Sequence, residues 1–288
     1  MTEPSPTSSD RRIAFSGEPG AFAEDAVRLA FGDVERVGLP GFRPVFDDVA
    51  AGRSIAGMVP IENSVHGTVR ENYDLLLEHD LEIRAEVVVP VRLCLAALPG
   101  ERLDGVERVY SHVQALGQAE AFLRTRSWAL LTTYNTAGAG RLIVDRQEHG
   151  SAAVLSPRAA AVFGLDILAD PIQDVADNRT RFLVVARPGA TLPPSREPAG
   201  EAMRTTLVVS VRNEPGALLR VLAVFAAHGL NMSTIESRPS RERAWEYVFW
   251  VDLDTDVEAP PARAALADLE PVTTVLRVLG SYPRSATG

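Results

Sequence analysis

The amino-acid sequence predicts an α/β fold followed by a small ferredoxin-like domain. Over roughly the first 185 residues, short β-type runs alternate with helical patterns, which implies a mostly parallel sheet. The stretch 187–200 carries four prolines and two glycines and is typical of a linker. The order predicted after this linker is βαββαβ. A chain of 288 residues is long enough for two such domains.

In the first part, strands are predicted at short apolar runs and helices at patterns with a 3.6-residue period. The predicted strands are Ile13–Phe15, Ile55–Ile61, Val87–Ala97, Arg108–Tyr110, Ala129–Tyr134, Ala152–Leu155 and Phe182–Val185. The predicted helices are Ala21–Phe31, Thr68–Leu77, Val113–Thr125, Ala137–Gln147 and Arg158–Phe163. The long run 81–98 suits one bent strand or two, and it suits a crossover between two lobes.

In the second part, two helices are predicted to cover one face of a four-stranded sheet. The predicted strands are Thr205–Val211, Met232–Ser237, Trp245–Asp252 and Thr273–Leu279, and the predicted helices are Ala217–His228 and Ala262–Leu269. Gly229 stands where a helix of this kind ends. We expect the second face of the sheet to be free to meet a partner.

Composition narrows the class of function. A net charge of −9 argues against a nucleic-acid partner. All 29 basic residues are Arg, so a Schiff-base lysine is excluded. The single cysteine, Cys94, lies in an apolar run and cannot form an internal disulfide or a cysteine-rich metal site. No apolar run approaches 18 residues and residues 1–10 form a polar leader, so we expect a cytoplasmic protein without a membrane partner.

Polar residues follow five of the predicted strands. They lie at 16–20, 62–64, 111–112, 135–136 and 156–157. Each group can cap the helix that follows it. Together they place polar side chains and helix N-termini at the carboxyl ends of strands, where open α/β sheets bind ligands and favour anions. The sequence contains neither a Walker A motif nor a Gly-x-Gly-x-x-Gly motif, so nucleotide binding has little support.

The stretch Asp177–Phe182 places Thr180 between Arg179 and Arg181, where a polar loop runs into an apolar strand. A guanidinium binds a carboxylate through two parallel hydrogen bonds. A hydroxyl between two such groups is placed to touch a small molecule that they hold. The alternative interpretation is a solvated strand end.

Several motifs, in this order, resemble prephenate dehydratase with a C-terminal ACT regulatory domain, from about residue 11 to 283. They are Gly17–Phe22, Val59–Ser64 with Gly67–Val69, Ser111–Leu116, Asp177–Phe182, Pro215–Leu218 and Asn231–Pro239. Two positions depart from the family pattern. Val113 replaces a proline, and the run Gly117–Ala119 lacks the usual cysteine; both are packing choices that leave His112 and Gln114 in place.

The resemblance implies a two-lobed catalytic region like that of periplasmic binding proteins at 11–187, with lobes at about 11–90 with 180–187 and at 91–179. A linker at 188–203 and an ACT domain at 204–283 follow. Such enzymes convert prephenate to phenylpyruvate, water and carbon dioxide. The reaction requires no metal or organic cofactor.

The resemblance also assigns roles to residues. Thr180 matches the threonine on which the family depends, and its role is to hydrogen bond the departing hydroxyl. Glu62 is the proposed proton partner if it is buried, and the alternative is that it caps a helix; His112 is a second proton candidate. The expected substrate contacts are Asn63, Ser64, Ser111, Gln114, Arg179, Arg181 and Phe182. Because successive strand residues face opposite sides, we expect the two arginines to share the carboxylate clamp unequally.

ACT domains commonly bind amino acids between two copies, so the resemblance implies a phenylalanine effector and a homodimer or a tetramer. The expected effector site comprises Asn213, Pro215, Gly216, Ala217, Leu218, Asn231, Met232, Glu236, Ser237 and Arg238. Three alternatives stay open. These are an arogenate dehydratase, a prephenate decarboxylase of the same fold, and a small-molecule binding module without catalysis.

Overall fold

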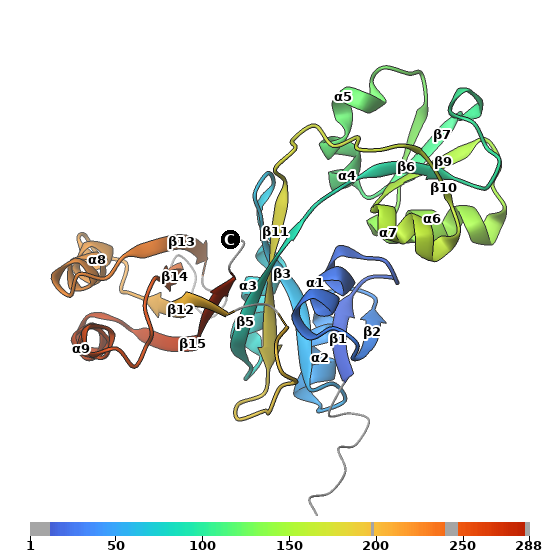
Figure 1. The fold of residues 1–288 in the computed structure, drawn as a ribbon. Helices are drawn as coiled ribbons and strands as arrows, with labels where there is room; N and C mark the ends of the chain where they lie inside the picture. The colour runs from blue at the N-terminus through green and yellow to red at the C-terminus, as the bar shows by residue number, and fades with distance from the viewer. Residues whose placement is uncertain (1–11, 197–198, 240–246, 286–288) are drawn as a thin grey trace, which may run out of the picture.

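The computed structural model describes residues 12–196, 199–239 and 247–285. In these ranges the chain forms three β-sheets, which Figure 1 shows as two lobes beside a smaller C-terminal domain. Three sequence predictions fall outside the described residues: the leader 1–10, the domain start at Arg11 and the strand start at Trp245.

The first sheet lies at the centre of the molecule and carries helices on both faces (Figure 1). Its strand order is β2-β1-β3-β11-β5, and the short strand β4 pairs with β3. Helix α1 covers one face, while α2 and α3 cover the other. The bounds are β1 Arg12–Ser16, α1 Phe22–Phe31, β2 Glu35–Leu39, α2 Phe42–Ala50, β3 Ala56–Asn63, β4 Gly67–Thr68, α3 Arg70–Glu78, β5 Glu82–Pro90 and β11 Arg179–Ala186.

The second sheet forms the other lobe, with strand order β10-β6-β9-β7-β8. Helices α4 and α5 pack on one face, and α6 and α7 pack on the other. The bounds are β6 Cys94–Ala97, a 3-10 turn Leu103–Gly105, β7 Arg108–Ser111, α4 Val113–Gln118, α5 Glu120–Leu123, β8 Ala129–Thr132, α6 Thr136–Arg146, β9 Ser151–Leu155, α7 Pro157–Phe163 and β10 Asp166–Ala169.

Both sheets are mixed, so the prediction of mostly parallel sheet is wrong in part. Strand β1 runs parallel to β2 and β3, but β11 runs antiparallel to both β3 and β5. The chain leaves the first lobe after β5 and returns from the second lobe as β11, so the returning strand has the opposite direction to β3. The amino end of β11 therefore lies beside the carboxyl end of β3.

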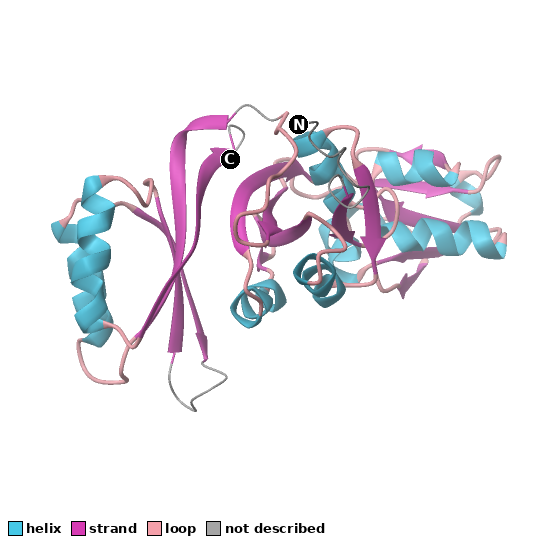
Figure 2. Ribbon diagram, turned by 90° about the horizontal axis from the view of Figure 1, so that it is seen from below, coloured by secondary structure: helices cyan, strands magenta, loops and turns pink. Residues whose placement is uncertain are grey.

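The C-terminal domain is an antiparallel sheet of order β13-β14-β12-β15 with α8 and α9 on one face. This is the predicted βαββαβ sandwich. Figure 2 shows both helices on the side away from the first lobe. The bounds are β12 Ala199–Ser210, α8 Ala217–Ala227, β13 Met232–Pro239, β14 Tyr247–Leu253, α9 Pro260–Leu269, a 3-10 turn Glu270–Val272 and β15 Val275–Ser285.

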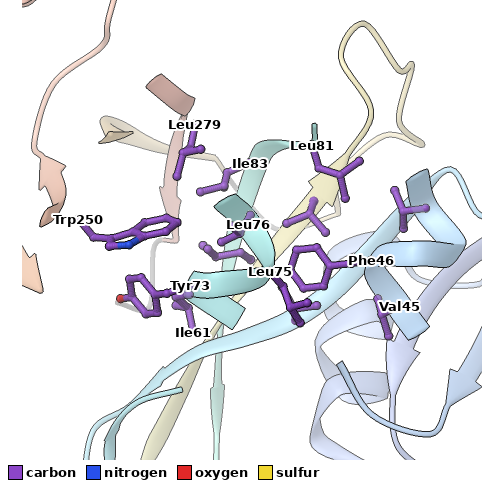
Figure 3. Packing of buried hydrophobic residues seen from close by; sticks show 14 of the residues in the cluster. Val45, Phe46, Ile61, Tyr73, Leu75, Leu76, Leu81, Ile83, Trp250 and Leu279 are labelled. Atoms are coloured by element: carbon purple, nitrogen blue, oxygen red, sulfur yellow. The ribbon is translucent and has the colours of Figure 1, made fainter. Parts of the chain in front are cut away.

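The second face of this sheet packs against the first lobe (Figure 3). Trp250 and Leu279 share a buried cluster with Tyr73 and Leu76 of α3. The rings of Trp250 and Tyr73 meet edge to face with centroids 4.8 Å apart. The expectation that this face is free for a partner is therefore wrong, because the chain covers it with its own first lobe.

Some elements differ from the sequence prediction. The run 81–98 forms two strands, β5 and β6, and the predicted helix Val113–Thr125 is divided into α4 and α5. Strands β2 and β10 and helix α2 were not predicted. Helix α2 was missed because Gly41 and Pro44 mimic a loop, although proline is tolerated in the first turn of a helix.

Candidate active site

A β-bulge brings the side chains of Asn63 and Thr180 together. The two residues pair across β3 and β11, but the register shifts between Arg181 and Phe182. The extra residue on β3 is Ile61, which has no partner of its own on β11. Such a bulge changes the phase of a strand by one residue. It therefore turns Asn63 to the face of the sheet that carries Thr180.

The side-chain amide of Asn63 is fully engaged. Its Nδ2 donates to Thr180 Oγ1 at 3.0 Å, to Asn178 Oδ1 at 2.8 Å and to the Arg179 carbonyl at 3.1 Å. Its Oδ1 accepts from two backbone N–H groups of the following turn, at 2.9 and 3.0 Å. Asn63 is thus a positioning residue, and the expected role as a donor to a substrate carboxylate does not fit.

This contact orients the hydroxyl of Thr180. A hydroxyl has one O–H donor and two acceptor lone pairs. Because Oγ1 accepts from Asn63 at 3.0 Å, the hydroxyl proton points elsewhere. The side chain of Thr180 is half-buried at the strand end. The arrangement therefore presents a hydrogen-bond donor at the edge shared by β3 and β11.

Arg179 and Ser64 secure the ends of the same two strands. The Ser64 N–H donates to the Arg179 carbonyl, and Ser64 Oγ accepts from the Arg179 N–H, both at 2.9 Å. The Arg179 guanidinium is 44% exposed and pairs with Asp177 at 2.6 Å. Arg179 is accordingly the arginine of this motif that solvent and a ligand can reach, while Ser64 acts on the backbone.

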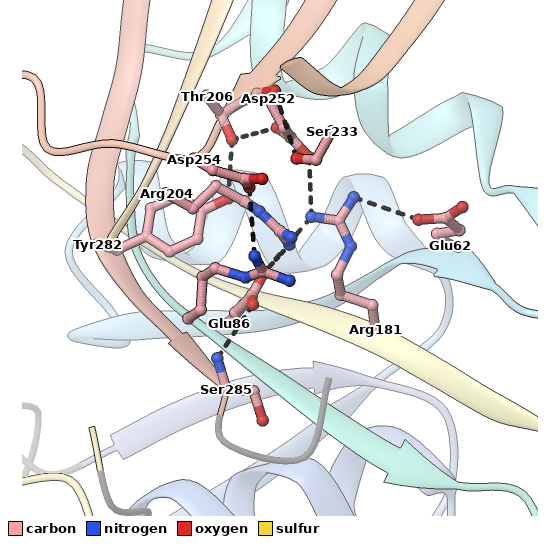
Figure 4. Close-up of polar contacts among 11 residues, drawn as sticks. Glu62, Glu86, Arg181, Arg204, Thr206, Ser233, Asp252, Asp254, Tyr282 and Ser285 are labelled. Atoms are coloured by element: carbon pink, nitrogen blue, oxygen red, sulfur yellow. Dashed lines mark hydrogen bonds and ion pairs between the residues drawn. The ribbon is translucent and has the colours of Figure 1, made fainter. Parts of the chain in front are cut away.

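Arg181 faces the C-terminal domain instead. Its side chain is 11% exposed, and its guanidinium pairs with Asp252 at 3.0 Å, Glu62 at 3.3 Å and Glu86 at 3.4 Å (Figure 4). Burial opposes the charged form, but Asp252 above all, followed by Tyr282 and Glu86, outweighs it and raises the pKa of Arg181. The predicted contact between Arg181 and the substrate is therefore replaced by an ion-pair network between domains.

Two arguments from the sequence need correction here. Residues two apart on a strand share a face, so alternation does not explain why Arg179 and Arg181 have different partners. The two differ because Arg179 stands at the exposed start of β11, whereas Arg181 lies farther along the strand and is covered by the C-terminal domain. Glu62 was expected to be a buried proton partner or a helix cap. Its side chain is 46% exposed and bound to Arg181, and α3 begins only at Arg70, so neither condition is met.

Phe182 and Ser111 are also not placed as predicted. Phe182 is 2% exposed and packs in the core beneath α1, because it follows the point where β11 enters the sheet. Ser111 is fully buried, and its hydroxyl donates to the Val154 carbonyl at 2.6 Å. Both residues support the fold of the site instead of lining it.

In the second lobe, the strand-end residues serve as helix caps. The side chains of His112, Asn135 and Ser156 accept from the first turns of α4, α6 and α7. Burial lowers the pKa of His112, which favours the neutral ring that this cap requires. Gln114 is exposed in the first turn of α4, so it stays available to a ligand.

The contacts between the two lobes were not predicted from the sequence. His66 Nδ1 and Gln118 Nε2 lie 3.3 Å apart and join the turn after Asn63 to α4. On the other side, Glu18 accepts from the Tyr134 hydroxyl at 2.7 Å and from Arg141 at 2.8 Å. Only the placement of Glu18 in a strand-end group hinted at this role.

The predicted effector residues fall on three parts of the C-terminal domain. The turn before α8 holds Asn213, Pro215 and Gly216 on the surface, and Gly216 has φ +78°, which glycine tolerates best. Ala217 is 4% exposed and packs in the domain core, and Leu218 is half-buried.

The other effector residues lie at the start of β13 and along it. Asn231 donates to Asp254 at 2.6 Å, Met232 packs against the domain core, and Ser237 is exposed. Glu236 and Arg238 point toward the first lobe.

The described part of the chain gives little support to a cysteine nucleophile, a metal site or a membrane-spanning helix. Cys94 is fully buried and its pKa is raised to about 12 by burial, so it is not a ready nucleophile. Among the residues that the structure describes, no three His, Cys, Asp or Glu side chains gather where they could hold a metal ion. Nor does any helix within the described ranges have the length and apolarity to cross a membrane.

The chain passes between the two lobes from β5 to β6 and again from β10 to β11, and a ferredoxin-like domain follows. The fold is therefore that of a two-lobed α/β protein with an appended ferredoxin-like domain. The prephenate dehydratase family model matches residues 13–190, and the ACT domain model matches residues 205–271. The chain therefore belongs to the prephenate dehydratase family and carries a C-terminal ACT domain.

Individual relatives and solved structures match this chain over nearly its whole length. The chain is 38% identical over 296 residues to arogenate dehydratase/prephenate dehydratase 2 of Arabidopsis thaliana, covering all of this chain and 76% of the relative. The structure of an Arthrobacter aurescens prephenate dehydratase in complex with L-Phe matches with TM-score 0.85 and 35% identity, over 96% of this chain and 91% of that one. GqqA, described as a quorum quenching acylase, matches with TM-score 0.86 and 33% identity, over 96% and 99%.

Proposed function

We propose that the chain is a prephenate dehydratase, which converts prephenate to phenylpyruvate, water and carbon dioxide. The observation that carries this proposal is the Thr180 hydroxyl, which accepts from Asn63 and so keeps its proton for another acceptor. Hydroxide is a poor leaving group, so a hydrogen bond that strengthens as the C–O bond breaks lowers the barrier.

Thr180 acts here as a hydrogen-bond donor and not as a full acid. The pKa of an ordinary hydroxyl is far too high for complete proton transfer, so the proton that completes water comes from solvent or from a second group. Glu62 loses support as that group, because it is half-exposed and ion-paired.

Arg179 is the proposed clamp for the side-chain pyruvyl carboxylate. Its guanidinium is 44% exposed at the start of β11, where a ligand can reach it. The ring carboxylate leaves as carbon dioxide, and tight pairing would stabilise that ground state and slow the step. We therefore place the ring carboxylate away from Arg179, with Gln114 of the second lobe as a candidate neutral contact.

Spectrophotometric detection of phenylpyruvate tests the proposal. Purified protein is incubated with prephenate, and ultraviolet absorbance follows the product. Formation of phenylpyruvate at a rate that saturates with prephenate concentration supports the dehydratase. Binding of prephenate without turnover would support a binding module instead, and loss of carbon dioxide with retention of the hydroxyl would support a decarboxylase.

The second candidate substrate is arogenate. It differs from prephenate by an amine in place of the side-chain keto group, and the Arabidopsis relative is named for both activities. Both substrates present the same carboxylates and the same leaving hydroxyl to Thr180 and Arg179. Comparing kcat/KM for the two substrates separates them, since an arogenate enzyme would prefer the amine.

Phenylalanine is the proposed effector, bound at the ACT domain. The Arthrobacter structure, which carries L-Phe, supports this assignment. A dimer through the ACT domains is also proposed, because β13 is an edge strand whose Ile235 is 42% exposed and because Leu219 on α8 is 68% exposed. Light scattering with and without phenylalanine distinguishes a monomer, a dimer and a tetramer.

The cytoplasm stays the predicted location, and the Arabidopsis relative is named as chloroplastic. Fractionation of the native cells tests it.

A further inference from the structure

The ACT domain is linked to the β3–β4 hairpin, residues 56–68, by two routes, one direct and one through Arg181 of β11. This hairpin carries Asn63, which orients the hydroxyl of Thr180. One contact is an ion-pair network around Arg181, and the other is a hydrogen bond from Thr68. Since Glu62 and Thr68 pair across the hairpin, both contacts act on the same short piece of sheet.

The first contact is a network of charged side chains, most of which are buried. Arg181 pairs with Asp252 of the ACT strand β14 and with Glu62 of the hairpin, while Arg204 of the ACT strand β12 pairs with Glu86 of β5 (Figure 4). Two buried cations thus meet two buried anions, and Glu62 is a third, half-exposed anion. Buried charges hold their positions tightly because separating them leaves a charge without a partner.

The position of Arg181 makes this network relevant to catalysis. Arg181 follows Thr180 directly, and Glu62 directly precedes Asn63. A guanidinium that binds Asp252 and Glu62 together therefore ties the ACT sheet to both residues of the Thr180–Asn63 contact. A shift of β14 relative to the first lobe pulls on both strands at the point where they form the site.

The second contact starts from the strand that we place in the effector site. Glu236 Oε2 accepts from Thr68 Oγ1 at 3.3 Å, and Arg238 pairs with Asp74 of α3 at 3.0 Å. Glu236 is also a candidate acceptor for the ammonium of phenylalanine. A carboxylate that turns toward the effector weakens its hydrogen bond to the hairpin.

We propose that the β3–β4 hairpin transmits phenylalanine binding at the ACT domain to Thr180, through the Asp252–Arg181–Glu62 and Glu236–Thr68 contacts. This inference rests on the proposed dehydratase activity and its inhibition by phenylalanine. Without the effector, the two contacts hold Asn63 where it orients the hydroxyl. When the effector moves β13 and β14, Asn63 leaves that position. Because the hydroxyl acts in the transition state, phenylalanine lowers kcat more than it raises KM.

The test compares Asp252→Asn with a matched control in the ACT domain. The amide keeps an acceptor for Thr206, and Arg181 keeps Glu62 and Glu86, so the variant retains partners for its buried cation. Asp268→Asn is the control, because Asp268 is an exposed carboxylate that pairs with His228 on the helical face. For each protein, kcat and KM for prephenate are measured with and without saturating phenylalanine, and calorimetry measures phenylalanine binding.

In the wild type and in Asp268→Asn, phenylalanine is expected to lower kcat by roughly 5- to 150-fold, the usual range of allosteric coupling. In Asp252→Asn the factor is expected to fall below about 2-fold while phenylalanine still binds. Thr68→Val, which removes only the hydroxyl of the second contact, is expected to reduce the factor in part, and Thr68→Ser to restore it.

Several results would overturn the inference. They are an unchanged inhibition factor in Asp252→Asn, loss of phenylalanine binding in that variant, equal loss of inhibition in Asp268→Asn, and a wild type that phenylalanine does not inhibit. A wild type that forms no phenylpyruvate would instead refute the proposed function itself.

Discussion

Replacing Asn63 by aspartate tests whether Asn63 directs the proton of Thr180. The change keeps the Oδ1 acceptor for the backbone N–H groups of the following turn. It replaces the Nδ2 donor with an anionic oxygen beside Thr180 Oγ1, which is now 3.0 Å from that nitrogen. The buried Nδ2 of Asn178 has no partner, so this amide can rotate and donate to the new carboxylate. The fold should therefore tolerate Asn63→Asp.

The size of the effect follows from the hydrogen bond that the substitution creates. The Thr180 hydroxyl would donate to a carboxylate, and a hydrogen bond to a charged group is worth about 1.5–3 kcal/mol. The donor must break that bond before it can serve the departing hydroxyl. At about 1.4 kcal/mol for each factor of ten, kcat should fall by about 10- to 150-fold. The Arg179 guanidinium is unchanged, so kcat should fall by a larger factor than KM rises, and the rise in KM reflects the added negative charge beside an anionic substrate.

Steady-state kinetics with prephenate, followed by ultraviolet absorbance of phenylpyruvate, measures this effect. Thr180→Ser is the matched control, because it keeps a hydroxyl at the same position and should retain most of the activity. A melting temperature near that of the wild type shows that Asn63→Asp is folded. If folded Asn63→Asp turns over at the wild-type rate, Asn63 does not orient Thr180 and the geometric argument fails.

Three further predictions concern Arg179, Arg181 and His112. Arg179→Ala should raise KM by about 10- to 150-fold with a smaller effect on kcat, and saturation kinetics that show the reverse would exclude the clamp. Arg181→Ala should lower the free energy of unfolding by about 3–5 kcal/mol, because buried Glu86 and Asp252 lose their shared cation; urea unfolding measures this. Burial lowers the pKa of His112 in the folded state, so its contribution to stability is present above its unfolded pKa of about 6.5 and is lost as pH falls below that value. His112→Asn keeps a cap acceptor without titrating, so its melting temperature should drop less than that of the wild type between about pH 7.5 and 5.5.

The sequence assigned Asn63 and Thr180 to one cleft, but it did not predict the contact between them. The polar residues after β3 were expected at the carboxyl edge of the sheet, whereas the antiparallel return of β11, which brings its amino end to that edge, was not predicted. The small βαββαβ domain was predictable, because its turns and apolar periods are local features. Local signals therefore predicted the elements and the segments that carry the site, and tertiary structure decided how those segments meet.

The roles of Glu62 and Arg181 were not predictable from local signals. Alternation along a strand gives no sign of the bulge at Ile61, which decides the faces of the residues after it. One partner of Arg181, Asp252, lies on β14, 71 residues farther along the chain, and the other two lie on β3 and β5. Phe182 was misplaced for a related reason, because only the tertiary fold shows where β11 enters the core.

The most direct test of the central claim is the rate of phenylpyruvate release from prephenate by the wild type and by Thr180→Val, measured side by side. Valine keeps the shape of threonine and removes only the hydroxyl. The account predicts that the wild type forms phenylpyruvate and that kcat of the variant is lower by about 10²- to 10⁴-fold, with a folded protein that still binds prephenate. A folded Thr180→Val that releases phenylpyruvate at the wild-type rate would contradict it.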